Sequence, residues 1–290
     1  MATPFTLDNR AASGFQDGSR YDKYRPSYPT EAVDKLLSHL GVANQNNARV
    51  IDLGSGTGKF TELIAARPEE FEIVAAEPHE GMREELVKKN LGSRIKVLDG
   101  DAGNIPVGAE WADALIAAQA FHWFATEESL KEIHRALRPG ASFGMIWNIE
   151  DYNAPKDWPS ASNWEQKLKD IIASLEDGHP RFRHLAWKRV FENQQDTTPL
   201  QTLKDTFTHH LPLFSLPIGE EDVKWTVYLT DEAIWSRYST LSQITNLKGA
   251  RLEEVRRKVF EALKADDVER NAAGEVAVHG RTHLAWTSRV

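Results

Sequence analysis

The segment 50–58 constrains the fold of this chain more than any other part of the sequence. An apolar, β-branched run leads into Asp52, and three glycines then alternate with small polar residues in the order Gly54, Ser55, Gly56, Thr57, Gly58. Because glycine has no Cβ, such a loop adopts positive φ and lets a ligand approach the backbone. A stretch with helical apolar spacing follows and stops before Pro68. Strand, glycine turn and helix predict a ligand site at the carboxyl end of a parallel strand.

Three kinds of nucleotide-binding loop share this outline, and two of them fail at specific positions. If Gly58 and Lys59 were the Gly-Lys of a phosphate-binding loop, Leu53 would replace its first glycine and Phe60 its Ser/Thr. The dinucleotide pattern G-x-G-x-x-G fails because Lys59 stands where its last small residue belongs. An acid followed by three alternating glycines fits at every position from Asp52 onward. This pattern resembles the first motif of class I S-adenosylmethionine (SAM) methyltransferases.

Composition bounds the class of protein. The chain has 290 residues, of which 41% are apolar, enough for one large domain or a core with a cap. The formal charge of −8 disfavours nucleic-acid partners, which need a basic surface. The absence of cysteine excludes disulfides, thiolate metal sites and radical SAM chemistry, and favours a cytoplasmic setting. With no signal-like N-terminus and no run of ~20 apolar residues, we expect no membrane partner. The oligomeric state stays open, with a monomer favoured.

Short apolar runs alternate with amphipathic stretches through the first half of the chain. Strands are expected at 48–53, 71–76, 94–98, 112–118 and 141–147. Helices are expected at 58–66, 79–90 and 126–137. Apolar strands with short connections predict an α/β fold with a Rossmann-like, doubly wound sheet. Two late strands, at 207–214 and 275–289, would bring the sheet to seven strands.

The pattern changes after Asn148, where Trp, Pro and charged residues become frequent and a helical cap is expected. The expected domains are an N-terminal lid segment at 1–29, a cofactor-binding core at 30–148, a cap insertion at 149–206, and a C-terminal part of the core at 207–290 that carries a second insertion at about 219–270. Within these insertions, helices are expected near 162–176, 181–192, 220–240 and 249–264.

Further candidate cofactor residues follow the next two strands. Glu77 ends the second strand, where its carboxylate can accept hydrogen bonds from both ribose hydroxyls, and Pro78 follows it. Met82 offers a soft apolar surface for adenine; alternatively it is a core residue of the helix that follows. After the third strand, Asp101 and the amide of Ala102 are placed to bind the adenine edge; the alternative for Asp101 is an Asx turn.

The fourth strand leads into Gln119, which we assign to the cofactor site, and then into an aromatic run. The residues expected at the acceptor site are Phe121, His122, Trp123, Trp147 and Asn148. His122 is the candidate general base; alternatively it hydrogen-bonds the acceptor or fixes the loop. An alcohol or amine acceptor needs a base, whereas a carboxylate is already ionised and a thiol with a pKa of ~8.5 is partly ionised at neutral pH.

Together these residues resemble class I methyltransferases of the ubiquinone-biosynthesis type, over about residues 20–148 but poorly over the cap. The Tyr/Arg/Pro-rich segment 21–29, the Ala-Phe-His-Trp-Phe run and the Met-Ile-Trp-Asn run are similar to a fungal small-molecule branch. That branch includes gliotoxin-type dithiol S-methyltransferases and trans-aconitate methyltransferases. The resemblance implies SAM as cofactor, S-adenosylhomocysteine as product, and an N-terminal segment that closes over the cofactor through Tyr21 and Arg25, whose guanidinium suits a carboxylate.

The methyl acceptor is a small molecule whose identity stays open. An acidic chain with many cap aromatics favours a neutral, apolar acceptor, with a dithiol of secondary metabolism first and a carboxylate second. A carboxylate would call for basic residues, for which Arg181, Arg183 and Arg281 are available. A catalytically silent methyltransferase-like regulatory subunit should show a broken glycine loop or lack the ribose acid, and this chain has neither sign. Lys59 disfavours a nicotinamide-dependent oxidoreductase. The histidines lack metal-ligand spacing, so no metal is expected.

Overall fold

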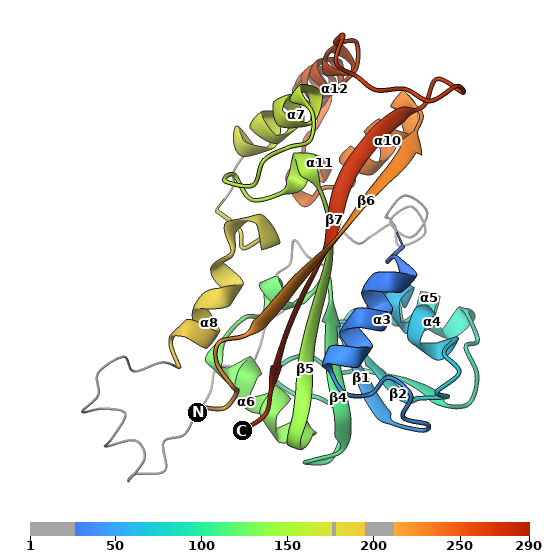
Figure 1. Ribbon diagram of the computed structural model, residues 1–290, viewed down its shortest axis with the longest axis vertical. Coiled ribbons are helices and arrows are strands. Elements are labelled where there is room, and N and C mark those ends of the chain that lie inside the picture. The colour runs from blue at the N-terminus through green and yellow to red at the C-terminus, as the bar shows by residue number, and fades with distance from the viewer. Residues whose placement is uncertain (1–26, 176–177, 195–211) are drawn as a thin grey trace.

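A computed structural model describes residues 27–175, 178–194 and 212–290 (Figure 1). Its seven strands form one sheet in the order β3-β2-β1-β4-β5-β7-β6, which confirms the expected Rossmann-like, seven-stranded architecture. The strands are β1 (Arg49–Leu53), β2 (Glu72–Ala76), β3 (Ile95–Leu98), β4 (Ala112–Ala118), β5 (Leu137–Glu150), β6 (Gly219–Leu229) and β7 (Val276–Ser288). The first five are parallel, whereas β7 runs antiparallel to both β5 and β6.

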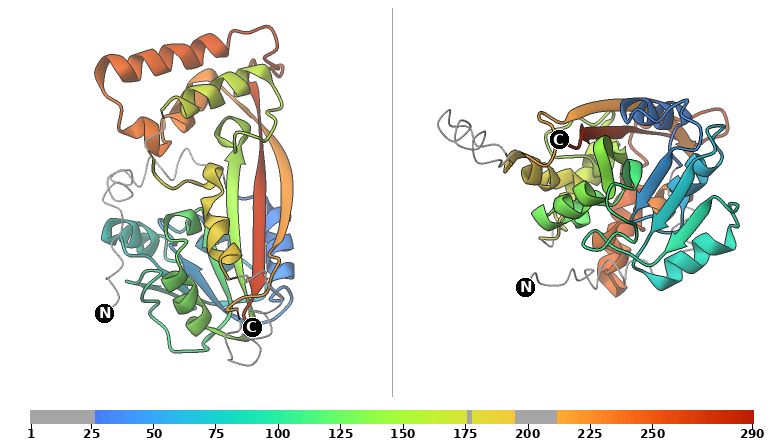
Figure 2. Two further views of the ribbon diagram at one scale, coloured as in Figure 1. Left: turned by 90° about the vertical axis from the view of Figure 1, so that its left-hand side faces the viewer. Right: turned by 90° about the horizontal axis from the view of Figure 1, so that it is seen from below.

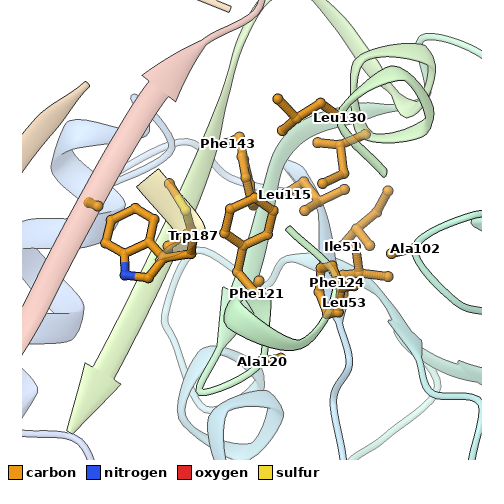
Figure 3. Packing of buried hydrophobic residues seen from close by; sticks show 14 of the residues in the cluster. Ile51, Leu53, Ala102, Leu115, Ala120, Phe121, Phe124, Leu130, Phe143 and Trp187 are labelled. Carbon is orange, nitrogen blue, oxygen red and sulfur yellow. The ribbon is translucent and has the colours of Figure 1, made fainter. Parts of the chain in front are cut away.

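Helices cover both faces of the sheet (Figure 2). They are α3 (Thr30–His39), α4 (Lys59–Ala65), α5 (Glu80–Lys88), the short 3-10 turn η1 (Phe121–Trp123) and α6 (Glu127–Ala136). Because side chains alternate along a strand, Val50 packs toward α3 and α4, while its neighbour Ile51 packs toward α6. The cluster on the α6 side includes Phe121, Phe143 and Trp187 (Figure 3).

The three strands β5, β7 and β6 extend past the core and carry the cap at their far end (Figure 1). The cap helices are α7 (Asn163–Ala173), α10 (Asp231–Tyr238), α11 (Ser242–Thr245) and α12 (Gly249–Ala262). A separate core of the cap joins Trp164, Tyr238 and Val259 to Val276 and Val278 of β7. Helices α7 and α12 confirm the predictions near 162–176 and 249–264.

The helix expected near 220–240 is wrong over its first half. Residues 219–229 form β6, which pairs along its whole length with β7, and only α10 is helical. Val223, Trp225 and Val227 alternate with exposed polar residues, which is the pattern of a half-buried strand. The first residues of the segment expected as a second insertion therefore belong to the sheet.

The continuous helix expected near 181–192 is also wrong. The chain forms two 3-10 turns, η3 (Phe182–His184) and η4 (Ala186–Lys188), before the single turn α8 (Arg189–Glu192). Leu185 has a φ of 52°, which interrupts helical geometry between the two turns. Most of the strand expected at 207–214 lies outside the described residues; Phe214 at its end bridges to Arg289.

Candidate active site

The glycine loop joins β1 to α4 with left-handed backbone at all three glycines. The φ angles are 70° at Gly54, 55° at Gly56 and 86° at Gly58. A Cβ on Gly54 would lie 2.9 Å from Cβ of Ala120, and one on Gly58 would lie 2.2 Å from Cδ1 of Leu86. The first glycine therefore lets the loop meet the end of β4, and the third lets α4 pack against α5. Larger residues at these positions would separate the elements that form the site.

Glu77 fastens this loop to the end of β2. One carboxylate oxygen accepts a hydrogen bond from the Gly56 amide at 2.9 Å, and the other accepts one from the His79 amide at 2.9 Å. Burial raises the pKa of Glu77 above its ordinary value, although both hydrogen bonds act in the opposite direction. Each oxygen keeps a second lone pair, so the carboxylate can still accept hydroxyl protons from a ligand.

Asp52 is fully buried at the end of β1. Its Oδ2 accepts the Thr61 hydroxyl proton at 2.6 Å, whereas Oδ1 has no hydrogen-bond partner in the part of the chain described. Burial raises the pKa of Asp52 to about 7; the Thr61 hydrogen bond lowers it and the nearby Glu77 raises it. The hydroxyl of Ser55 is likewise buried without a partner there. A ligand that donates hydrogen bonds or carries positive charge would satisfy these groups.

The residues expected to bind adenine lie near the glycine loop, and each makes different contacts there. Met82 is buried, and its sulfur lies 3.8 Å from the position of a Cβ on Gly56. The Pro78 carbonyl accepts a hydrogen bond from a neighbouring arginine at 2.7 Å. Asp101 forms the alternative Asx turn, since its Oδ1 accepts the amides two and three residues further on, at 2.7 and 3.0 Å. Ala102 is buried in the core cluster. Adenine binding by this group stays a prediction.

Gln119 connects the ends of β4 and β5. It has a φ of 57°, and its amide donates to the Ile146 carbonyl at 2.8 Å, so the chain turns sharply into η1. Its side-chain Nε2 donates to the Asn148 carbonyl at 2.8 Å. The Asn148 side chain in turn accepts from the Thr282 hydroxyl at 2.6 Å and donates to the Ser27 carbonyl at 3.1 Å. The structure thus brings Gln119 and Asn148 together as one hydrogen-bonded group.

Two of the residues expected to face an acceptor are instead part of the core. Phe121 is fully buried beside Phe143 and Trp187 (Figure 3), and Trp147 is fully buried as well. Both side chains extend a packed aromatic cluster, which leaves them no accessible surface for an acceptor. His122 and Trp123 are partly exposed and remain candidates for that role.

A hydrogen bond from Trp147 indicates which ring nitrogen of His122 carries the proton. The indole Nε1 donates to Nδ1 of His122 at 3.1 Å. Because indole can only donate, Nδ1 must be unprotonated, and the neutral imidazole carries its proton on Nε2. With the proton on Nε2 and the lone pair of Nδ1 engaged, the ring of His122 is better suited to donate a hydrogen bond than to abstract a proton.

A second polar cluster joins β6 to β7, and sequence reasoning missed it. His283 is buried with Nδ1 2.7 Å from Asp222 and Nε2 3.1 Å from Glu220. Burial alone would lower the pKa of His283, but the two carboxylates raise it above its ordinary value. Arg281 bonds Asp222 at 3.1 Å and lies over the Trp158 ring at 4.5 Å. Spacing along the chain gave no signal, because the partners come from an adjacent strand.

The remaining expectations concern a metal site, a membrane span and two residues of the N-terminal segment. In the three described ranges, no set of three or more His, Asp or Glu side chains is arranged to hold a metal ion. None of the described helices combines the length and apolar character needed to cross a bilayer. Tyr21 and Arg25, expected over the cofactor, lie outside the described residues.

Comparison with known proteins identifies the family. A model of the methyltransferase domain matches residues 50–140. An uncharacterized methyltransferase-like protein of Schizosaccharomyces pombe is 34% identical over 60% of this chain and 63% of its own length. An uncharacterized methyltransferase of Mycobacterium bovis is 32% identical over 74% of this chain and 70% of its own length. The match thus spans somewhat less than two thirds of the first relative's length and slightly more than two thirds of the second's.

Solved structures share the fold at low identity. A candidate type II methyltransferase of Anaeromyxobacter dehalogenans has a TM-score of 0.55 at 19% identity, covering 91% of this chain and 97% of that one. A Haemonchus contortus phosphoethanolamine N-methyltransferase, in complex with phosphomonomethylethanolamine and S-adenosylhomocysteine, has a TM-score of 0.51 at 12% identity, covering 98% of this chain and 59% of that one. The fold, the glycine loop with its paired carboxylates and the relatives agree: this chain belongs to the methyltransferase family.

Proposed function

We propose that this chain transfers a methyl group from SAM to a neutral small molecule, with a thiol as the preferred acceptor. The observation that carries this proposal is the loop of three left-handed glycines held between two buried carboxylates, Asp52 and Glu77. A phosphate would be repelled by these carboxylates, whereas a ligand with hydroxyl groups and positive charge would be bound.

The residues at the loop fit SAM. Glu77 would hold the ribose hydroxyls while it keeps its bonds to the loop, and the unsatisfied Oδ1 of Asp52 and Oγ of Ser55 would take hydrogen bonds from the ligand. Met82 would cover the adenine ring. SAM supplies a methyl group already activated by its sulfonium. The S-adenosylhomocysteine in the Haemonchus structure, which shares this fold, supports the same cofactor here.

Catalysis would depend mainly on orientation and the exclusion of water. Holding two reactants in line can supply ~7–11 kcal/mol of the barrier reduction. His122 would donate from Nε2 to the acceptor atom, because Nδ1 is held by Trp147. Such a donor stabilises a thiolate, which forms readily since an ordinary thiol has a pKa of ~8.5. A thiol acceptor therefore needs no general base in this arrangement.

The charge around the β5–β7–β6 strands supports a neutral acceptor. Arg281, a candidate partner for a carboxylate, is bonded to Asp222 and stacked on Trp158. His283 is bonded to two carboxylates in the same cluster. Positive charge on this face is thus balanced by acidic residues, which disfavours a polycarboxylate of the trans-aconitate type.

Mass spectrometry of an acceptor panel tests the proposal. The protein would be incubated with SAM and equal concentrations of dithiothreitol, a phenol, a primary amine and citrate. We expect methyl addition to sulfur first, with formation of S-adenosylhomocysteine. Methylation of citrate with thiols untouched would reverse the order of acceptors, and no product in the presence of bound SAM would support a silent, regulatory role.

A further inference from the structure

Glu150, the last residue of β5, is a buried acid without hydrogen bonds. Its side chain is 1% exposed, and neither carboxylate oxygen has a hydrogen-bond partner among the residues described. Glu165 in the cap is equally buried, but it accepts bonds from the His279 amide at 2.7 Å and the Ser162 hydroxyl at 2.7 Å. A buried carboxylate without hydrogen bonds is unfavourable, and a ligand with donor groups would supply them.

Trp225 on β6 presents a matching unsatisfied donor on the same face of the sheet. Gly280 of β7 pairs with Glu150 on one side and with Trp225 on the other. The indole lies over this glycine, since a Cβ there would come within 2.5 Å of the ring atom Cζ2, two bonds from Nε1. That Nε1 is buried and makes no hydrogen bond within the described ranges. Donor and acceptors thus flank one glycine without bonding each other.

Arg237 on α10 lies close to Glu150 and carries the opposite charge. Its Nη1 lies 3.8 Å from Oε1 of Glu150, beyond hydrogen-bond distance but close enough to balance the charge. The Arg237 side chain is 12% exposed, more than that of Glu150. Because the pair carries no net charge, a neutral group with both a donor and an acceptor fits better than an ammonium or a carboxylate.

Glu150 lies close to Asn148, one of the residues expected at the acceptor site. Asn148, two residues before Glu150 on the same face of β5, is bonded to Gln119 at the end of β4. Residues i and i+2 of a strand are ~6.6 Å apart. We propose that Glu150 and Trp225 bind the polar end of the methyl acceptor, a neutral amide or hydroxyl group that donates to the carboxylate and accepts from the indole. This inference rests on the proposed function.

Fragment binding in the presence of saturating S-adenosylhomocysteine tests the inference without requiring turnover. Benzamide, benzoate and benzylammonium share a ring and differ in the charge of the polar group. We expect ligand-observed NMR titration to show benzamide binding at least tenfold more tightly than the other two. Glu150→Gln should weaken benzamide at least fivefold, and Trp225→Phe about threefold, with the affinity for S-adenosylhomocysteine unchanged in both.

Glu165→Gln is the matched control, because it makes the same change at an equally buried acid whose hydrogen bonds are already satisfied. It should lower the melting temperature and leave benzamide affinity unchanged. If Glu150→Gln fails to fold, Trp225→Phe carries the test. Wild-type protein that binds S-adenosylhomocysteine but shows no preference for benzamide, or the same preference in both site variants, overturns this inference alone. Wild-type protein that does not bind S-adenosylhomocysteine overturns the proposed function instead.

Discussion

The two halves of the sheet build their sites in different ways. In the parallel half, backbone and nearby residues suffice: the Gly56 amide bonds Glu77, 21 positions away, and Asp52 bonds Thr61, nine positions away. In the antiparallel half, side chains meet across long separations, as Asn148 and Thr282 do at 134 positions. The proposed cofactor site is thus specified by local motifs, whereas the proposed acceptor site depends on how distant strands pair.

The largest expected effect concerns Gly58 in the parallel half, where a positive φ and close packing leave no room for a side chain. Gly58→Ala would place a Cβ 2.2 Å from Leu86 at a φ of 86°. Strain and overpacking together should lower the free energy of unfolding by about 4 kcal/mol, as measured by urea denaturation. Gly92→Ala is the control, because its φ is 106° but no atom lies within 4 Å. Equal losses in the two variants would show that packing of α4 on α5 is not what the third glycine provides.

The next prediction concerns the buried charge of Asp52. Since its pKa is raised to about 7, the folded protein holds this proton more tightly than the unfolded chain does. The free energy of unfolding should therefore fall as pH rises from 5 toward 7, by about 2 kcal/mol for this group. Asp52→Asn should lack that decline, and thermal unfolding of both proteins at several pH values measures the difference. Parallel curves for the two proteins would contradict the assignment.

A smaller dependence of the same sign is expected in the antiparallel half. The raised pKa of His283 means that its bonds to Glu220 and Asp222 stabilise the fold at low pH, and that this contribution is lost as pH rises through the folded pKa. His283→Gln should cost about 2 kcal/mol near pH 6 and less at pH 8. His39→Gln, at a half-exposed pair with Glu221, serves as control and should cost little. A loss for His283→Gln that does not vary with pH would argue for packing alone.

The smallest effect probes the contact that links the two halves. Trp147→Phe removes the indole donor to His122, so this bond no longer keeps Nδ1 unprotonated. We expect kcat to fall about fivefold, equivalent to about 1 kcal/mol, with cofactor affinity unchanged. Trp187→Phe provides the comparison, since that indole is also buried but makes no hydrogen bond within the described ranges. Similar rates in the two variants would remove the role proposed for the tautomer.

The contrast between halves also explains how far the sequence could predict the structure. The strands through β5, the helices between them and the paired acids Asp52 and Glu77 follow from periodicity and loop chemistry within short windows. The stretch near 220–240 was expected to be helical, yet pairing with β7 makes residues 219–229 a strand. Two neighbours could not be predicted for the same reason: Glu220 as the partner of His283, and Trp225 across Gly280 from Glu150. Their proximity exists only once β7 lies between β5 and β6.

Sequence reasoning also placed too many aromatic residues at the site. Phe121, His122 and Trp123 were expected to face the acceptor, as was Trp147, but Phe121 and Trp147 are buried in the core. A strand-end motif gives the position of a chain segment and not the direction of each side chain. The sharp turn at Gln119, with its positive φ, decides which of these rings face inward.

Calorimetric binding of S-adenosylhomocysteine tests the central claim most directly. The loop with its two buried carboxylates predicts saturable binding to one site and a raised melting temperature, with no such effect from NAD or ATP at the same concentration. Glu77→Gln should weaken binding at least tenfold, because it removes an acceptor for both the loop and the ribose. Absence of binding by SAM and S-adenosylhomocysteine alike, or equal binding of NAD, would contradict the account.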